Sequence, residues 1–526
     1  MKQNIIGGAY QSLPTSGTKY ACLSGGGNIA ISGAWQATLS SVQTYITTPG
    51  TISGLRIKLS DAPGASKSYI FNVQLNGADT LLTCTVSGTA TTGSDLTNTI
   101  AVVAGDLVNL SCTASGTPTT SYAQWASLFT STNTAESLLL FLTGVETTSD
   151  GFSPLSSSQF NGYDGVENNM RQVCPTAGTL KNLYIRLSQN PGGGTKGYNF
   201  TVRKNGVNTL LTVTVSGTNT TGNDTTNAVT VIAGDVLTLS TGRVNSPSNA
   251  AQVSGGLTFV ATVDGESIIL GGTSDGLSAS ATEYVSPQSS GLNEVWFATE
   301  AQRQQLISAA SELKKLYVLL SGAPGAGKSF TFTLRDAGDT SLAVTISDTN
   351  TTGNNTSVSV IALAADSVSL QVVPTSTPAA YAAYWGLVCV IISIPATPSN
   401  VSPADGATDI NLTPTLGSSA FSGSGTHLAS QWQVKLFTDA DWNSPKFDSG
   451  EDTTNLVSIS LSTSLDLNMD YQWRVRHENE AGWSEWSTAT VFSTEKRGIL
   501  VTCKLFNRTL SQKLSNRTLT LKAKSV

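Results

Sequence analysis

The sequence is poor in charged side chains, since only 12% of its 526 residues are Asp, Glu, Lys or Arg. Thr, Ser, Asn and Gly are abundant instead, which is typical of an all-β protein whose surface carries neutral polar side chains. The formal net charge is -6, and an acidic chain offers no general attraction for the phosphates of a nucleic acid. We therefore expect no nucleic-acid partner.

Residue types that carry out catalysis or bind metals are scarce. The two histidines, His427 and His477, have no cluster of Asp, Glu or Cys beside them in the sequence, so we interpret them as core or surface residues. No G-x-S-x-G sequence indicates an esterase. Paired carboxylates for glycan cleavage stay open, because their separation depends on the tertiary structure. We expect no enzyme activity, and predict no catalytic, cofactor-binding or metal-binding residue and no cofactor.

The six cysteines are far apart, and no two of them form a C-x-x-C pair, which argues against a zinc site. Cys84 occupies a position that holds valine in two related segments, Val213 and Val344. We therefore interpret the cysteines as buried free thiols that behave as small apolar residues. A disulfide between Cys84 and Cys112 is the alternative, which the sequence leaves open because the separation of two strands is not known.

Long apolar runs are also absent. The longest have about the length of a β-strand, far short of the roughly 20 residues that a membrane-spanning helix needs, so we expect no membrane insertion. Residues 1–17 hold no apolar stretch long enough for a secretory signal. We therefore expect synthesis in the cytoplasm, followed by release through lysis or a dedicated route.

The sequence does contain an internal repeat. LRIKLSDAPGASKSYIFNV begins at Leu55, LYIRLSQNPGGGTKGYNFTV at Leu183 and LYVLLSGAPGAGKSFTFTL at Leu316. Each segment is followed by alternating apolar and polar residues and by turns rich in Thr, Asn and Gly, a pattern that predicts short antiparallel strands. The repeat length of roughly 130 residues is the size of one domain.

These patterns predict an all-β protein with three tandem jelly-roll-like β-sandwich repeats. An N-terminal segment, a tryptophan-rich domain and a basic tail complete the chain. The predicted boundaries are 1–17 for the N-terminal segment, 18–134, 135–263 and 264–394 for the repeats, 395–497 for the tryptophan-rich domain and 498–526 for the tail.

The third repeat contains GAPGAGKS at 322–329, which matches the phosphate-binding pattern G-x-x-x-x-G-K-[ST]. That pattern binds phosphate only where a helix begins at the lysine. Here SFTFTL follows, whose alternation predicts a strand. In the sister segments Ser66 and Gly194 align with Gly327, and Thr195 of the second segment aligns with Lys328. We therefore predict an exposed turn between two strands that binds no nucleotide.

The alignment of the three copies makes further predictions. Residues 298–316 are good helix formers, but they align with 42–55 of the first copy, which predicts a strand and a turn instead. Trp35 and Trp296 are expected in equivalent positions. Equivalent core positions are expected for Leu55, Leu183 and Leu316.

After residue 394 the sequence becomes rich in tryptophan. YQWRVR at 471–476 and AGWSEWS at 481–487 give the segment 395–497 a resemblance to a fibronectin type III domain. WSEWS also resembles the WSxWS box of cytokine receptors, in which arginines stack on tryptophan faces. Arg474 and Arg476 would supply the guanidinium groups, and we interpret the stack as a structural feature of the sandwich.

The tail, 498–526, is basic and has an alternating pattern. From residue 496 onward there is no acidic residue, and the basic residues are Lys496, Arg497, Lys504, Arg508, Lys513, Arg517, Lys522 and Lys524. We predict two short strands that anchor the chain by pairing edge to edge with another subunit or a particle. A disordered tail is the alternative, and residues 1–17 are the alternative anchor.

The triplicated segments KNGVNTLLTVTVSGT, P-G-x-G-K and A-G-D, followed by the Pro-linked fibronectin-like domain, resemble the β-sandwich repeat proteins of tailed-bacteriophage virions. The resemblance implies a non-enzymatic structural protein on the virion surface, as a head decoration, head fibre or tail fibre, that mediates assembly or host-surface adhesion. It implies capsid or tail proteins as partners through 498–526, a host surface glycan or protein, and a homo-oligomer, usually a trimer for such fibres. A secreted bacterial adhesin and a glycan-cleaving tail spike are the alternatives.

Overall fold

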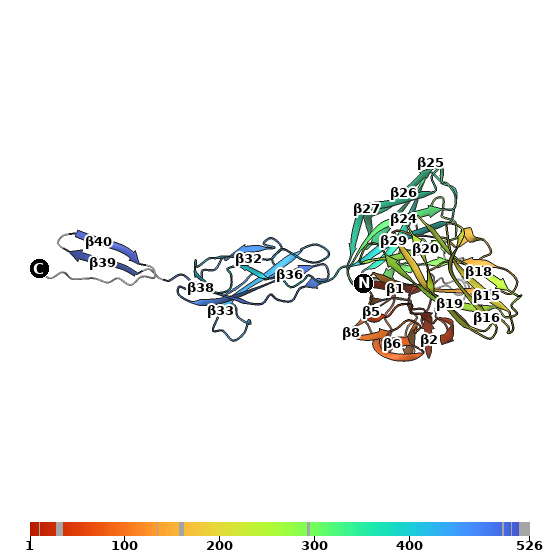
Figure 1. The fold of residues 1–526 in the computed structure, drawn as a ribbon, viewed down its shortest axis with the longest axis horizontal. Helices are drawn as coiled ribbons and strands as arrows, with labels where there is room; N and C mark the ends of the chain where they lie inside the picture. The colour runs from red at the N-terminus through yellow and green to blue at the C-terminus, as the bar shows by residue number, and fades with distance from the viewer. Residues whose placement is uncertain are drawn as a thin grey trace. The chain divides into compact units, whose positions relative to one another are not determined.

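The computed structural model describes residues 1–9, 11–27, 35–133, 135–156, 163–291, 295–496, 499–505 and 508–514. Within these residues the regular structure consists of β-strands and three short 3-10 turns, which confirms the all-β prediction. The chain divides into two compact units, Met1–Ile391 and Ile392–Val526. Figure 1 shows the first unit in red to green and the second in blue.

The first unit contains three repeats, each built from two β-sheets. The first repeat consists of β1 (Lys2–Ala9), β2 (Thr18–Ala21), β3 (Gly25–Gly27), η1 (Leu39–Ser41), β4 (Thr44–Tyr45), β5 (Gly50–Leu59), β6 (Gly64–Leu75), β7 (Ala78–Gly88), β8 (Thr92–Val102), β9 (Leu107–Ser115) and β10 (Ala123–Ser131). One sheet has the order β3-β1-β10-β5-β8 and the other β2-β9-β6-β7, with β4 also paired to β9. Of the eight main strands, β1, β10, β5 and β8 lie in the first sheet and β2, β9, β6 and β7 in the second. The chain passes from one sheet to the other at every connection between these strands except that from β6 to β7, and the first strand lies beside the last, which is the jelly-roll arrangement.

The other two repeats follow the same order. The second consists of β11 (Glu136–Val145), β12 (Gly151–Ser153), η2 (Glu167–Asn169), β13 (Gln172–Val173), β14 (Gly178–Leu187), β15 (Gly197–Lys204), β16 (Val207–Ser216), β17 (Thr221–Val231), β18 (Val236–Val244) and β19 (Ala251–Ala261). The third consists of β20 (Glu266–Thr273), β21 (Glu283–Val285), β22 (Ser290–Gly291), η3 (Glu300–Gln302), β23 (Gln305–Leu306), β24 (Ser311–Leu320), β25 (Gly325–Asp336), β26 (Asp339–Asp348), β27 (Thr352–Ala362), β28 (Ser367–Thr375) and β29 (Ala383–Ile391). Their main sheets, β11-β19-β14-β17 and β20-β29-β24-β27, confirm the prediction of three jelly-roll-like repeats.

The predicted start of the first repeat at residue 18 is wrong. Strand β1 pairs with β10 along its whole length, from Lys2 opposite Thr130 to Ala9 opposite Ala123. It therefore corresponds to β11 and β20, the first strands of the other repeats. Its two isoleucines face opposite sides and both are buried, so residues 2–9 are an inner strand of the sandwich and not a separate segment.

Other predictions from the alignment are confirmed. Leu55, Leu183 and Leu316 are each fully buried and each follows a β-bulge in its strand. The ring of Trp35 lies 5.5 Å from that of Trp125, and Trp296 lies 5.7 Å from Trp385. Residues 298–316 contain η3, β23 and the start of β24, as the register predicted, because strand pairing outweighs the helix propensity of single residues.

The three repeats pack against one another in a cyclic order. The outward face of each first strand is buried in the core of a neighbouring repeat. Leu138 and Leu140 of β11 pack into the core of the first repeat, and Ile268 and Leu270 of β20 pack into that of the second. Ile6 of β1 closes the cycle by packing into the core of the third.

Polar contacts follow the same cyclic order. Gln288 of the third repeat donates through Nε2 to Ser24 Oγ of the first repeat at 2.8 Å and to Ser156 Oγ of the second at 3.1 Å. All three side chains are buried, so this contact joins the three repeats at one point. Between the first two repeats, the hydroxyls of Thr47 and Thr258 are 2.8 Å apart.

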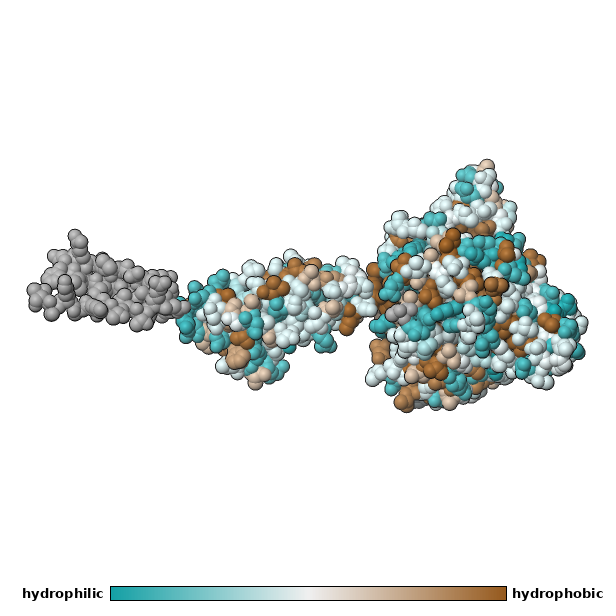
Figure 2. Space-filling model, viewed as in Figure 1, coloured by the Kyte–Doolittle hydropathy of each residue, from teal (hydrophilic) through white to brown (hydrophobic). Residues whose placement is uncertain are grey.

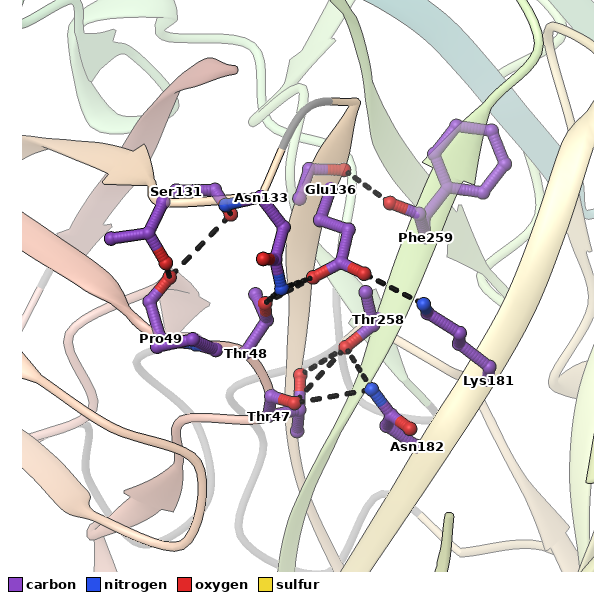
Figure 3. A network of polar contacts seen from close by, with 12 residues as sticks. Thr47, Thr48, Pro49, Ser131, Asn133, Glu136, Lys181, Asn182, Thr258 and Phe259 are labelled. Atoms are coloured by element: carbon purple, nitrogen blue, oxygen red, sulfur yellow. Dashed lines mark hydrogen bonds and ion pairs between the residues drawn. The ribbon is translucent and has the colours of Figure 1, made fainter. Parts of the chain in front are cut away.

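A buried carboxylate also connects the first two repeats (Figure 3). Glu136 of β11, with a side chain only 8% exposed, lies 2.6 Å from Lys181 Nζ. It also accepts hydrogen bonds from Thr48 Oγ1 and from Asn133 Nδ2. Burial raises the pKa of Glu136, but the hydrogen bonds from Lys181, Thr48 and Asn133 outweigh burial and hold the pKa below its ordinary value. The ionised carboxylate therefore stabilises this junction.

The second unit begins with a small sandwich. Its strands are β30 (Asn400–Ser402), β31 (Ala407–Ile410), β32 (Thr415–Ser418), β33 (Ala429–Leu436), β34 (Phe447–Asp448), β35 (Ser458–Ser460), β36 (Asp470–Asn479), β37 (Gly482–Trp483) and β38 (Thr490–Thr494). A sheet β30-β32-β35 faces a sheet β31-β38-β36-β33-β34, and the core stacks Trp432 on Trp473 at 6.1 Å. Tyr471, at the start of β36, accepts a hydrogen bond from the backbone N–H of Asp466 at 2.9 Å, the tyrosine corner of such sandwiches. The fibronectin III-like prediction is confirmed.

The described cysteines are free and buried. This holds for Cys22, Cys84, Cys112, Cys174 and Cys389, while the side chain of Cys503 lies outside the described residues. Cys84 and Cys112 both lie opposite Phe71, on the two strands that flank β6. Because a whole strand separates them, by about 10 Å, they cannot form the alternative disulfide.

Candidate functional site

The segment 322–329 forms a turn and the start of a strand. It joins β24 to β25, and β25 begins at Gly325, so no helix follows Lys328, as predicted. The N–H of Gly327 donates to Asp348 Oδ1 at 2.8 Å. A carboxylate therefore already occupies one of the backbone groups that would face a phosphate, and it would repel one. The absence of nucleotide binding stays a prediction.

Arginines and tryptophans alternate along one face of the fibronectin III-like sandwich. The guanidinium of Arg474 lies between Trp442 and Trp486, at 4.2 and 4.1 Å from the ring centroids. Arg476 lies between Trp486 and Trp483, at 4.6 and 4.5 Å. The predicted stacking of both arginines is confirmed, and Trp442 extends it by one ring that the WSEWS sequence does not contain.

This arrangement is held by hydrogen bonds from its own domain. Gln433 Oε1 accepts from Arg474 and Gln431 Oε1 accepts from Arg476. Ser487 Oγ accepts from the backbone N–H of Val475 at 2.9 Å. Each guanidinium therefore has partners on its edge and on both faces, which favours a structural role over ligand binding.

The two histidines lie side by side in this domain, with ring centroids 4.4 Å apart, and Phe421 stacks on His427 at 4.7 Å. His477 is fully buried. Burial, together with the neighbouring His427, lowers the pKa of His477 to about 4. Burial also lowers the pKa of the half-buried His427, so both rings are neutral at neutral pH. His477 is a core residue and His427 packs beside it nearer the surface, in agreement with the interpretation of the two histidines as core or surface residues.

The described residues contain no group of three or more His, Cys, Asp or Glu side chains arranged to hold a metal ion. In the same part of the chain, no helix has the length and apolar character needed to cross a membrane.

The basic tail contains a hairpin. Strands β39 (Ile499–Leu505) and β40 (Arg508–Leu514) pair antiparallel, from Ile499 opposite Leu514 to Leu505 opposite Arg508. Among the described strands, each pairs only with the other. The prediction of two short basic strands is confirmed for 499–514, and the part of the tail from 515 to 526 lies outside the described residues.

A cavity at the junction of the third and first repeats was not predicted from the sequence. It has a volume of about 390 Å³ and is lined by residues of β1, β5, β10 and the η3 turn. Arg303, which follows η3, is one of its lining residues and is only 1% exposed. One signal was available, because the residues that follow η1 and η2 at equivalent positions are apolar, Val42 and Met170.

Comparisons with known proteins give no family. No protein-family model and no curated protein matches the sequence. Among solved structures, the chain is similar to the FN1–FN3 domains of chicken CNTN1, at 11% identity and a TM-score of 0.16, covering 59% of this chain and 97% of that one. It is also similar to the BSP domain of a biofilm-associated protein, at 9% identity and a TM-score of 0.12, covering 84% and 90%. Such low scores carry no argument about function, and the fold assignment rests on strand order.

Proposed function

We propose that the chain is a non-enzymatic structural protein on the surface of a bacteriophage particle, attached through its C-terminal hairpin, with the three-repeat unit displayed. The observation that carries this proposal is the pairing of β39 and β40 with each other alone among the described strands. The bacteriophage particle itself is proposed from the sequence resemblance. Head and tail positions are both compatible with it.

The hairpin has the properties of an attachment element. A two-stranded hairpin is at best marginally stable alone in water. The outer edges of β39 and β40 pair with no other described strand, so their backbone N–H and C=O groups can add to a sheet of a partner. The basic residues of the tail would draw it toward an acidic surface, in a manner that salt screens. Charge would then govern the encounter, and strand pairing would hold the complex.

The first unit suits display. Its three jelly rolls bury the outer faces of their first strands in one another, so the repeats support one another as one body. On the face visible in Figure 2, hydrophobic residues are interspersed with hydrophilic and neutral ones. A host surface glycan or protein is the partner that we propose for this body, and a homo-oligomer, a trimer among the options, stays a prediction.

The test compares the full chain with a variant that lacks residues 498–526, on particles assembled without this protein. We expect the truncated chain to stay folded and to lose particle binding. A second variant, Thr502→Pro, keeps every charge but removes a backbone donor of β39, which pairs through Thr502 with Ser511 of β40. This variant should still be attracted to the particle in a salt-sensitive way, but it should no longer stay attached.

Circular dichroism of both variants provides the folding control. Normal attachment of the truncated chain would contradict the proposed anchor and place it elsewhere in the chain. Failure of the full chain to bind any phage particle would contradict the virion role.

A further inference from the structure

The junctions between repeats are built from equivalent elements but are filled differently. At the junction of the first and second repeats, Leu142 packs with Val42 and Cys22. At the junction of the second and third, Tyr384 packs with Val173. The junction of the third and first repeats instead contains the cavity of about 390 Å³.

The strand register explains this difference. Leu142 lies opposite Ser254, and Tyr384 lies opposite Gly272, so each of these pairs has one large side chain. The equivalent pair at the third junction is Gly8 opposite Gln124. Neither residue fills the space that leucine or tyrosine fills elsewhere, and the cavity is the result.

The walls of this cavity carry positive charge. Arg303 lies where the other repeats have Val42 and Met170, and its guanidinium is stacked 4.5 Å from the ring centroid of Phe297. Lys58 lies opposite Gln124 on β5, where the second repeat has Arg186 opposite Ser254 and the third has Leu319 opposite Tyr384. The cavity thus combines the absence of a large side chain with two cations, and of these Arg303 stands where both other repeats have an apolar residue.

The remaining lining is polar and aromatic. Lys58 Nζ donates to Ser367 Oγ at 2.9 Å, and Ser367 Oγ donates to Gln124 Oε1 at 3.0 Å, which holds the lysine at the wall. Gln302, Gln304 and Tyr122 also line the space. No aspartate or glutamate is among the described residues that line it. Glu300, on the η3 turn itself, is engaged by Arg335.

We propose that this cavity binds an acidic sugar unit. Lys58 and Arg303 would neutralise the carboxylate of the sugar. The side-chain amides of the lining glutamines can both donate and accept hydrogen bonds, so they would bind its hydroxyl groups. Tyr122 offers an aromatic surface for the sugar ring. The volume lies at the lower end of the range for small-molecule sites, which suits a monosaccharide or disaccharide. The inference deepens the proposed surface role by naming a ligand class for the displayed body.

The experiment is isothermal titration calorimetry on the full chain. The probes are glucuronate and N-acetylneuraminate as acidic sugars, glucose as a neutral sugar and inorganic phosphate as a bare anion. We expect the acidic sugars to bind, with an affinity that falls as sodium chloride is raised. Glucose and phosphate should bind at least about tenfold more weakly. Glucose has no carboxylate for the two cations, and phosphate has no sugar hydroxyl groups for the glutamine amides.

Three variants copy residues that the other repeats already use. Gln124→Tyr copies Tyr384 and fills the cavity, so acidic-sugar binding should be lost. Arg303→Met copies Met170 and Lys58→Leu copies Leu319, and each should weaken acidic-sugar binding by about tenfold or more. The control is Lys196→Leu, which removes a positive charge from a partly exposed lysine of the second repeat and should leave the affinity unchanged.

Several results would overturn the proposal. These are no binding of either acidic sugar, equal binding of glucose or phosphate, or undiminished binding by a folded Gln124→Tyr variant. If a variant fails to fold, the comparison of acidic sugars with glucose and phosphate on the unaltered chain, together with its salt dependence, still tests the proposal. The sugar titration needs no phage particles, so its result is independent of the attachment experiment. Absence of sugar binding would overturn this inference and leave the proposed hairpin attachment untouched, and loss of the attachment proposal would leave the sugar site untouched.

Discussion

Phe141 and Gly255 face each other across β11 and β19, and a side chain at Gly255 would overlap the Phe141 ring. In the first repeat the same pair is reversed, with Gly7 on the first strand opposite Trp125. The third repeat follows the first, with Gly271 opposite Trp385. Each repeat therefore places one aromatic ring over one glycine at this position, but the strand that supplies the ring differs.

This relationship predicts the effect of adding a side chain at the glycine. Gly7→Ala should lower the free energy of unfolding by about 1–3 kcal/mol, because the new Cβ would overlap the indole of Trp125 in a packed core. Chemical denaturation measures the loss. Gly242→Ala, on β18 of the second repeat with open space around it, is the matched control and should be close to neutral.

The reversal can be tested by exchanging the pair in the second repeat. Phe141→Gly alone should leave a cavity and Gly255→Trp alone should overpack the core. The double variant copies the first repeat and should be more stable than the sum of the two single effects predicts. Simple additivity would show that the ring and the glycine do not act as a pair.

The Glu136 network predicts a dependence of stability on pH. Its folded pKa is held below the ordinary value, so the stabilisation is present above the unfolded pKa and is lost as pH falls through the folded pKa. Glu136→Gln should therefore destabilise the protein at pH 7, by about 1–3 kcal/mol, and the deficit should shrink in acid. Denaturant titrations at several pH values measure it, with the exposed Glu485→Gln as control. A deficit that does not change with pH would contradict this account.

The buried histidine predicts acid sensitivity of the fibronectin III-like sandwich. The folded pKa of His477, about 4, lies below the ordinary 6.5, so the unfolded chain binds the proton more readily. Stability should fall as pH drops from 6.5 toward 4, by about 3 kcal/mol in all. Hydrogen exchange of the β36 amides, corrected for intrinsic rates, reports the loss. His477→Phe should remove most of this pH dependence, and an NMR titration of His477 near 6.5 would contradict the prediction.

The third repeat lacks a stabilising turn residue that the other two have. Asn76 and Asn205, both at positive φ, donate to Asp106 and Asp235. The equivalent residue, Ala337, also has positive φ but no side-chain amide.

Ala337→Asn should therefore stabilise the protein by about 0.5–1 kcal/mol, because Asn tolerates this conformation and would donate to Asp366. Burial and the nearby Asp366 raise the pKa of Asp336 to about 6, and the new donor should lower it. Thermal unfolding measures the gain, with Ala337→Ser as the comparison. Equal stability of the Asn and Ser variants would contradict the turn argument.

Much of the fold followed from local sequence pattern. The alternation in the segments that begin at Leu55, Leu183 and Leu316 is a property of neighbouring residues, and strands formed there. Alignment of the copies was also enough to reject a helix at 298–316 and a helix beginning at Lys328. Arg474 and Arg476 could be matched to WSEWS because they are two residues apart on one strand.

Three sandwich repeats, one fibronectin III-like sandwich and a basic pair of strands could be recognised from the amino-acid pattern, since periodicity is encoded over a few residues. The place of β1 in the first repeat could not, because its partner β10 lies over a hundred residues away. The cyclic packing and the cavity also became visible only in the folded chain. The packing and the cavity depend on which outward side chains of distant strands meet. Gly8 lies opposite Gln124, where a leucine or a tyrosine fills the equivalent space at the other junctions. Such contacts are set by burial between residues far apart in the sequence and not by local pattern.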